Sequence, residues 1–164
     1  MDEPVYKTSR ELGFDAVNSN NWIAALIYLN TAARQGQLDL AILDALGEAA
    51  YRAGVPEVLA QFQNYYKYPT VATHMARAFL MLGDVNSTIE FLNYAKDSAL
   101  KASLQAMLDI GKDIKITAAC VLPVAEKYPD LYYPEYWRAL AAVADAVGRE
   151  DLTRLSERKS KAFA

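Results

Sequence analysis

The sequence holds few of the residues on which catalytic and metal sites most often depend. Its one cysteine, Cys120, excludes an internal disulfide, and its apolar neighbours favour a buried and inert thiol. Its one histidine, His74, lies in an expected helical segment, where a packing or surface role is favoured over a role as a base. No carboxylate cluster has the spacing of a metal loop, and no glycine-rich loop would hold a phosphate. We therefore expect no enzyme, no metal and no cofactor, and a hydrolase or lyase based on His74 is the catalytic alternative.

Long apolar runs and an excess of basic charge are also missing. No apolar run approaches the roughly 20 residues that a membrane span needs. The first residues, Met1-Asp2-Glu3-Pro4, lack the basic and then apolar layout of a signal peptide. The net charge of −3 gives no indication of a nucleic-acid partner. These features predict a cytoplasmic protein without a membrane span, and the length suits a single domain over residues 1–164.

Glycine and proline are scarce, and they fall between segments whose apolar residues recur at helical spacing. No segment alternates with period two for long enough to predict a strand. Glycine, and next asparagine, suits the left-handed residue that ends a helix. We expect such turns at Asn20, Gly54, Gly83, Gly111 and Gly148. The pattern predicts an all-α fold in which helix, tight turn and helix occur five times, over residues 3–36, 39–67, 70–97, 99–128 and 134–163.

These hairpins resemble tetratricopeptide repeats. The first two turns are 34 residues apart, and Leu12-Gly13 and Leu46-Gly47 place a large and then a small residue in the first helix. The resemblance implies a right-handed α-α superhelix, a solenoid of about five hairpins with a concave groove that holds a peptide. The fourth hairpin departs from the pattern, because Ser103-Leu104 inverts the pair and Pro123 is expected to kink or end its helix. A different hairpin solenoid or an irregular bundle is the alternative.

The resemblance also selects groove residues on the first helix of each hairpin. Their charges are mixed, and Arg10 followed by Phe14 argues against the lysine–asparagine clamp with which some repeats grip a C-terminal carboxylate. An ordinary solvated helix face is the alternative for each of them. The candidates are Lys7, Arg10, Phe14, Asn18, Asp44, Glu48, Tyr51, Arg52, Thr73, Arg77, Met81, Lys101, Gln105 and Arg138.

Tyrosine is abundant, with eleven residues, and seven of them cluster at 65–68 and 128–136, where connectors are expected. Tyrosine suits interfaces, although wedging between hairpins is the favoured explanation for at least half of them. We predict a scaffold or adaptor that binds a protein or peptide segment. One alternative is a small secretion- or assembly-type chaperone that holds one partner protein. Another is a structural protein that self-assembles through its terminal hairpins or its tyrosine-rich connectors. A homo-oligomer is compatible with each of these functions.

Overall fold

The computed structural model describes residues 6–110 and 113–162, and within these ranges the chain forms helices and no β-strand. The all-α prediction is therefore confirmed for the described residues. The chain divides into two compact units, Met1–Ala95 (unit 1) and Lys96–Ala164 (unit 2). Each unit is described by itself.

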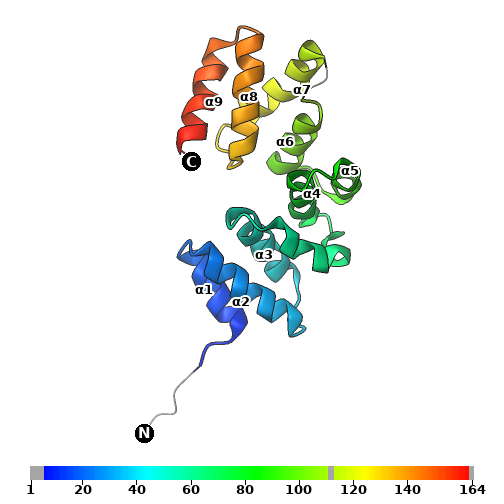
Figure 1. The fold of residues 1–164 in the computed structure, drawn as a ribbon, viewed down its shortest axis with the longest axis vertical. Helices are drawn as coiled ribbons and strands as arrows, with labels where there is room; N and C mark the ends of the chain where they lie inside the picture. Colours follow the sequence, from blue (N-terminus) through cyan, green and yellow to red (C-terminus); the bar gives the residue numbers. More distant parts are fainter. Residues whose placement is uncertain (1–5, 111–112, 163–164) are drawn as a thin grey trace. The chain divides into compact units, whose positions relative to one another are not determined.

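Unit 1 contains five α-helices and one 3-10 segment, labelled in Figure 1 where space allows. Helices α1 and α2 pack side by side, α3 packs against α2, and the segment η1 contacts both α3 and α4. Helix α5 packs against α4. The bounds are α1 Ser9–Asn18, α2 Trp22–Arg34, α3 Leu40–Arg52, η1 Pro56–Tyr66, α4 Ala72–Met81 and α5 Val85–Tyr94.

Unit 2 contains four helices, in which α8 lies beside α9 and also contacts α7. Trp137 and Tyr136 are fully buried, and each is anchored by one polar bond. The Tyr136 hydroxyl donates to the Val121 carbonyl at 2.8 Å, and the Trp137 indole donates to the Leu131 carbonyl at 2.7 Å. The bounds are α6 Ala99–Leu108, α7 Ile114–Lys127, α8 Pro134–Ala146 and α9 Glu150–Ala162.

Left-handed residues separate the helices at four of the five predicted turns. The backbone angle φ is positive at Asn20 (57°), Gly54 (74°), Gly83 (79°) and Gly148 (77°), as the sequence predicts. The fifth predicted turn, Gly111, lies outside the described residues. Two consecutive helical elements lie within each of the five predicted hairpin ranges.

Side-chain caps fix where several helices begin. Asn21, Asp39 and Asp84 each accept a hydrogen bond from a backbone N–H in the first turn of α2, α3 and α5. Ser98 caps α6 in the same way. These caps satisfy N–H groups that have no partner within the helix.

The second element of the second hairpin is a 3-10 segment rather than the expected α-helix. It is interrupted at Phe62, whose φ of −112° and ψ of 18° are not helical. Pro56, Leu59 and Phe62 are all buried, and their spacing of three places them on one edge of a 3-10 helix. Burial of this edge against α3 and α4 explains why the tighter geometry is adopted.

Pro123 does not end its helix, because α7 continues from Ile114 through Pro123 to Lys127. Proline removes one N–H donor, and the chain tolerates that loss at this exposed position. The inverted pair Ser103-Leu104 is buried, and the Ser103 hydroxyl donates to the Leu100 carbonyl of its own helix at 2.7 Å.

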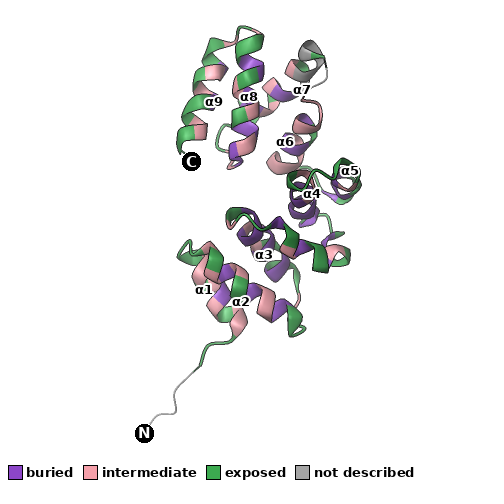
Figure 2. Ribbon diagram, viewed as in Figure 1, coloured by how far each residue is buried: buried purple, intermediate pink, exposed green. Residues whose placement is uncertain are grey.

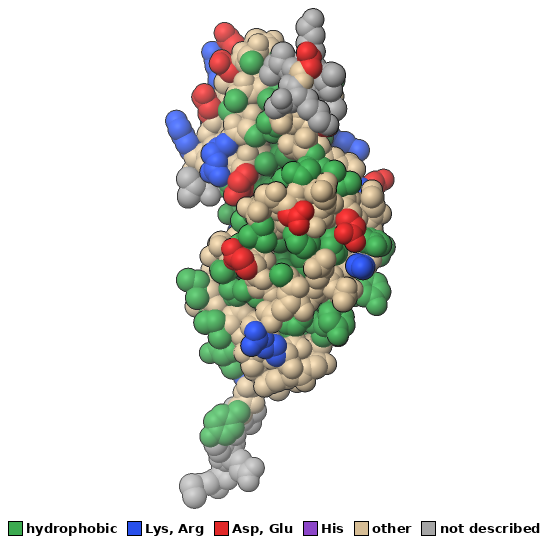
Figure 3. All heavy atoms as spheres, turned by 45° about the vertical axis from the view of Figure 1, so that its right-hand side comes forward, with side chains coloured by type: hydrophobic (Ala, Val, Ile, Leu, Met, Phe, Trp, Pro, Cys, Tyr) green, Lys and Arg blue, Asp and Glu red, His purple; other side chains and the backbone are tan. Residues whose placement is uncertain are grey.

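The two units differ in what they expose. Buried residues occur on helices of both units (Figure 2). However, every strongly exposed large hydrophobic side chain among the described residues lies between positions 6 and 94, in unit 1. Figure 3 shows hydrophobic side chains gathered over this part of the displayed face. None of the described helices combines the length and apolar character that a membrane crossing requires.

Candidate functional site

The predicted groove residues of unit 1 gather mainly between α3 and α4. Asp44, Glu48 and Arg52 lie on α3, and Arg77 lies on α4, where it forms a network with them and with His74. We call these five residues the α3–α4 network. The pairs that join the two helices, Asp44 with His74 and Glu48 with Arg77, are 30 and 29 residues apart along the chain, so only tertiary packing brings them together.

Arg77 is the centre of the α3–α4 network. Its side chain is 3% exposed, and its Nη2 atom donates to Glu48 Oε2 at 3.1 Å. The guanidinium carbon lies 3.8 Å from the centroid of the Tyr51 ring, a stacking arrangement that arginine favours. Glu48 Oε1 accepts a second bond from Arg52 Nε at 2.8 Å. One carboxylate therefore holds two guanidinium groups, and Arg77 is paired and stacked although it is buried.

His74 is held on both sides of its ring. Its Nε2 atom lies 2.7 Å from Asp44 Oδ1, and its Nδ1 atom lies 3.3 Å from Arg77 Nη2. Arginine can only donate, so Nδ1 accepts and the ring proton lies on Nε2, which donates to Asp44. Both nitrogens are occupied in this arrangement, and neither is free to accept a substrate proton. His74 is buried, in agreement with the packing role that was the favoured interpretation of the sequence.

A glycine on α3 makes room for the His74 ring. A Cβ atom at Gly47 would lie 2.4 Å from His74 Cγ, well inside contact distance. Gly13 on α1 plays a similar part, because a Cβ there would lie 2.6 Å from Leu29 Cδ2 on α2. Both glycines are the small members of the large–small pairs in the sequence, and both allow close helix approach.

The electrostatics of the α3–α4 network favour ionised carboxylates. Burial opposes ionisation of Glu48, but the charge of Arg77 and the hydrogen bonds from Arg52 and Arg77 outweigh it and lower the pKa of Glu48. The hydrogen bond from His74 is the largest cause that lowers the pKa of Asp44, and burial opposes it. The two carboxylates and two guanidinium groups balance, so the network is satisfied without a ligand.

An open apolar hollow of about 450 Å³ lies at the start of α3 and the end of η1. Leu43 of α3 lines the hollow, and its carbonyl accepts a hydrogen bond from the buried Tyr66 hydroxyl of η1 at 2.7 Å. Tyr65 and Tyr68, from the tyrosine-rich connector, are 52% and 55% exposed at the hollow. The lining residues are Leu38, Asp39, Leu40, Leu43, Tyr65 and Tyr68.

The apolar hollow was not among the predicted site residues. The family pattern selects groove positions on the first helix of each hairpin, whereas five of these six residues lie outside α3 or at its first position. The tyrosine cluster at 65–68 was the signal that could have located it. The sole charged lining residue, Asp39, caps α3 and accepts a bond from Arg10 at 2.8 Å.

The remaining groove candidates are not members of the α3–α4 network. Arg10 lies 5.0 Å from the Phe14 ring centroid on α1, and Lys7 pairs with Asp15. Thr73 is buried, which does not suit direct contact with a peptide. The others are exposed or partly exposed on their own helices, namely Asn18, Met81, Lys101, Gln105 and Arg138.

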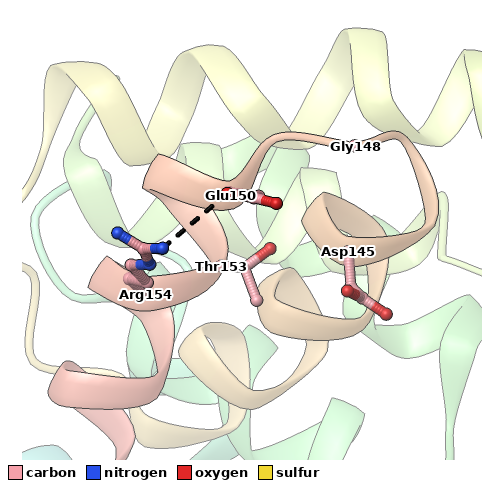
Figure 4. A pocket seen from close by; sticks show the side chains of 5 residues that line it. All are labelled: Asp145, Gly148, Glu150, Thr153 and Arg154. Carbon is pink, nitrogen blue, oxygen red and sulfur yellow. Dashed lines mark ion pairs between the residues drawn. The ribbon is translucent and has the colours of Figure 1, made fainter.

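A shallow recess at the turn between α8 and α9 holds charged residues of its own. Figure 4 shows Glu150 and Arg154 paired beside Gly148, with 3.7 Å between the carboxylate and the guanidinium. Both side chains are more than three-quarters exposed, at 86% and 78%, so the pair is a surface contact in water. Thr153 uses its hydroxyl to donate to the Arg149 carbonyl. The recess therefore offers no acid, base or nucleophile set.

The residues that the structure describes include no group of three or more His, Cys, Asp or Glu side chains placed to hold a metal ion. The side chain of Cys120, predicted to be buried and inert, lies outside the described residues. Comparisons with protein families, with curated proteins and with solved structures found no match.

Proposed function

We propose that this chain is a peptide-binding module built as a right-handed superhelix of hairpins similar to tetratricopeptide repeats. The order of helical pairs supports this architecture, as do the left-handed turns between partners of a pair. The close contacts at Gly13 and Gly47 support it further, because small residues at these positions are what the repeat pattern asks for.

The observation that carries the binding function is the apolar hollow. Tyr65, Tyr68 and Leu40 expose apolar surface around a concave space, while the adjoining network already satisfies its own charges. The only charged lining residue is paired with Arg10. Recognition would therefore rest on an apolar side chain of the partner that enters the hollow, with the tyrosine hydroxyls available for hydrogen bonds.

The test is selection of peptides from a random library on the immobilised protein, followed by affinity measurement of the selected sequences. We expect a shared large apolar residue in the selected peptides. The double variant Leu40→Ala/Tyr68→Ala should lose at least about tenfold in affinity, because it removes two apolar walls. Tyr28→Ala, at an exposed tyrosine of α2 outside the hollow, is the matched control and should bind like the unaltered chain.

The proposal fails if no peptide is selected, or if the double variant and the control bind equally well. Substitutions at Tyr51 or Arg77 would not serve as tests of binding, because both side chains are buried and their loss would disturb folding.

A further inference from the structure

A small polar cavity lies in unit 2, where the start of α6 meets the end of α7. These two helices pack against each other (Figure 1). The cavity has a volume of about 190 Å³, below the roughly 300 Å³ at which pockets for drug-sized molecules begin, so it suits a small ion or a single functional group. The residues that line it include Asp97, Ser98, Lys101, Gln105, Lys127 and Tyr128.

Two lysines from different helices bring positive charge to this cavity. The side chain of Lys101, on α6, is 17% exposed, and Lys127, the last residue of α7, is exposed. The one acidic lining residue, Asp97, has its Oδ1 atom 3.6 Å from Lys101 Nζ. However, the Asp97 side chain is fully exposed, so water screens much of its charge. Two lysines and one aspartate leave the lining with one excess positive charge.

Neutral hydrogen-bond donors accompany the two lysines. Ser98 Oγ accepts the Lys101 backbone N–H at 3.1 Å, and its hydroxyl proton is left to donate. Gln105 lies one turn after Lys101 on the same face of α6, and both were among the predicted groove residues. Within the described part of the chain, the Gln105 side chain has no hydrogen-bond partner. Tyr128 adds a second hydroxyl, and Lys127 Nζ lies 5.3 Å from the centroid of its ring.

We propose that this cavity binds a phosphate group, supplied either as inorganic phosphate or by a phosphorylated peptide. A phosphate group offers at least three strong acceptor oxygens and nearly two negative charges at about pH 7. The two ammonium, one amide and two hydroxyl groups of the lining match these oxygens and charges. A carboxylate has only two oxygens and one charge, so it would leave several of these donors unmatched.

The phosphate site is independent of the apolar hollow. All of its lining residues belong to unit 2, whereas the hollow belongs to unit 1. The proposed peptide binding rests on Leu40, Tyr65 and Tyr68, none of which lines the polar cavity. Failure of either proposal would therefore leave the other intact.

Helix α9 shows why basic residues alone do not define such a site. Arg154, Arg158 and Lys161 line another hollow of unit 2, but Asp151 and Glu157 lie among them. All five side chains come from one helix, so they border an anion on one side only. At the polar cavity, by contrast, Lys101 and Lys127 approach from two helices.

The first test is calorimetric titration of the full chain with sodium phosphate at about pH 7.5 and constant ionic strength. Because the cavity is open to water, we expect one site with a Kd of about 1 mM. Lys127→Gln should weaken binding at least about fivefold, since it removes one of the two charges that face the phosphate. Lys161→Gln removes the same charge outside the lining and should bind phosphate like the unaltered chain.

A variant that gains affinity guards against an effect of misfolding. Asp97→Asn removes the one negative charge of the lining at a fully exposed position, so it should bind phosphate about two- to threefold more tightly. The proposal is overturned if phosphate does not saturate the unaltered chain by about 20 mM. It is also overturned if Lys127→Gln and Lys161→Gln lose affinity equally, or if Asp97→Asn binds no more tightly.

The second test uses three further probes and identifies the source of the phosphate group. Sodium acetate should bind at least about tenfold more weakly than phosphate, and equal affinities would overturn the assignment of the ligand. A short phosphoserine peptide that binds more tightly than inorganic phosphate would assign the site to a phosphorylated partner, with the unphosphorylated peptide as control. A peptide that binds equally or more weakly would assign the site to inorganic phosphate.

Discussion

Gly47 on α3 leaves the space in which the His74 ring of α4 lies. Glycine here is required by space rather than by backbone conformation, because Gly47 lies within a regular helix. The His74 ring fills the volume that a methyl group would occupy, and it then connects Asp44 to Arg77. A single missing Cβ thus allows a polar group to lie between two packed helices.

Gly47→Ala is therefore expected to destabilise the chain by about 1–3 kcal/mol, because the added carbon overlaps the ring. His74→Ala removes the ring, so Gly47→Ala in that background should cost less. Urea unfolding of the four chains gives the coupling free energy between the two residues. If the free-energy costs of the two single variants add up to that of the double variant, the His74 ring does not occupy the space that the added carbon at position 47 needs.

At the scale of the elements, the α3–α4 network joins two helices through ionised carboxylates. The pKa values of Asp44 and Glu48 are lowered in the folded chain, so folding favours their charged forms. The resulting stabilisation of the folded chain is fully present at a pH above the pKa values of the unfolded carboxyls. It is lost as the pH falls through the lower pKa values that these carboxyls have in the folded chain.

Stability should accordingly fall between about pH 5 and about pH 3, and Glu48→Gln should flatten this fall because it removes one of the titrating carboxyls. Urea midpoints measured across that range give the slope. Glu57→Gln, at an exposed carboxyl on η1, is the control and should retain the slope of the unaltered chain. An unchanged slope in Glu48→Gln would show that Glu48 does not contribute to the loss of stability at low pH.

The elements also show where sequence reasoning succeeds and where it fails. Turns at Asn20 and Gly54 were predictable because a left-handed residue leaves a local signature. The 3-10 segment was not predictable from the sequence. Its buried residues Pro56, Leu59 and Phe62 recur every three positions, and this spacing differs from that of an α-helix by less than one residue per turn. The pairing of His74 with Asp44 was also not predictable, because the two residues lie 30 positions apart and no local pattern connects them.

At the scale of the whole molecule, both units contain a buried tyrosine that bonds to a main-chain carbonyl. Tyr66 in unit 1 donates to Leu43 at 2.7 Å, and Tyr136 in unit 2 donates to Val121 at 2.8 Å. Burial raises the pKa of both phenols, so both donate as neutral hydroxyls at ordinary pH. These matched bonds allow one unit to be weakened while the other is left as it is.

Tyr66→Phe and Tyr136→Phe should each cost about 0.5–1.5 kcal/mol, because each removes one buried hydrogen bond to a helical carbonyl. Hydrogen exchange measured by mass spectrometry should show faster exchange mainly in residues 6–95 for the first variant. The second variant should change mainly residues 96–162. Equal changes over the whole chain in both variants would mean that the two units open as one cooperative body.

The two tryptophans are divided between the units in the same way. Trp22 in unit 1 is partly exposed, and the guanidinium carbon of Arg52 lies 4.8 Å from its ring centroid, whereas Trp137 in unit 2 is fully buried. The emission of a buried indole lies at shorter wavelength than that of an indole in contact with water. The chain therefore carries two intrinsic optical reporters, one for each unit, and Trp22→Phe leaves a signal from unit 2 alone without any attached dye.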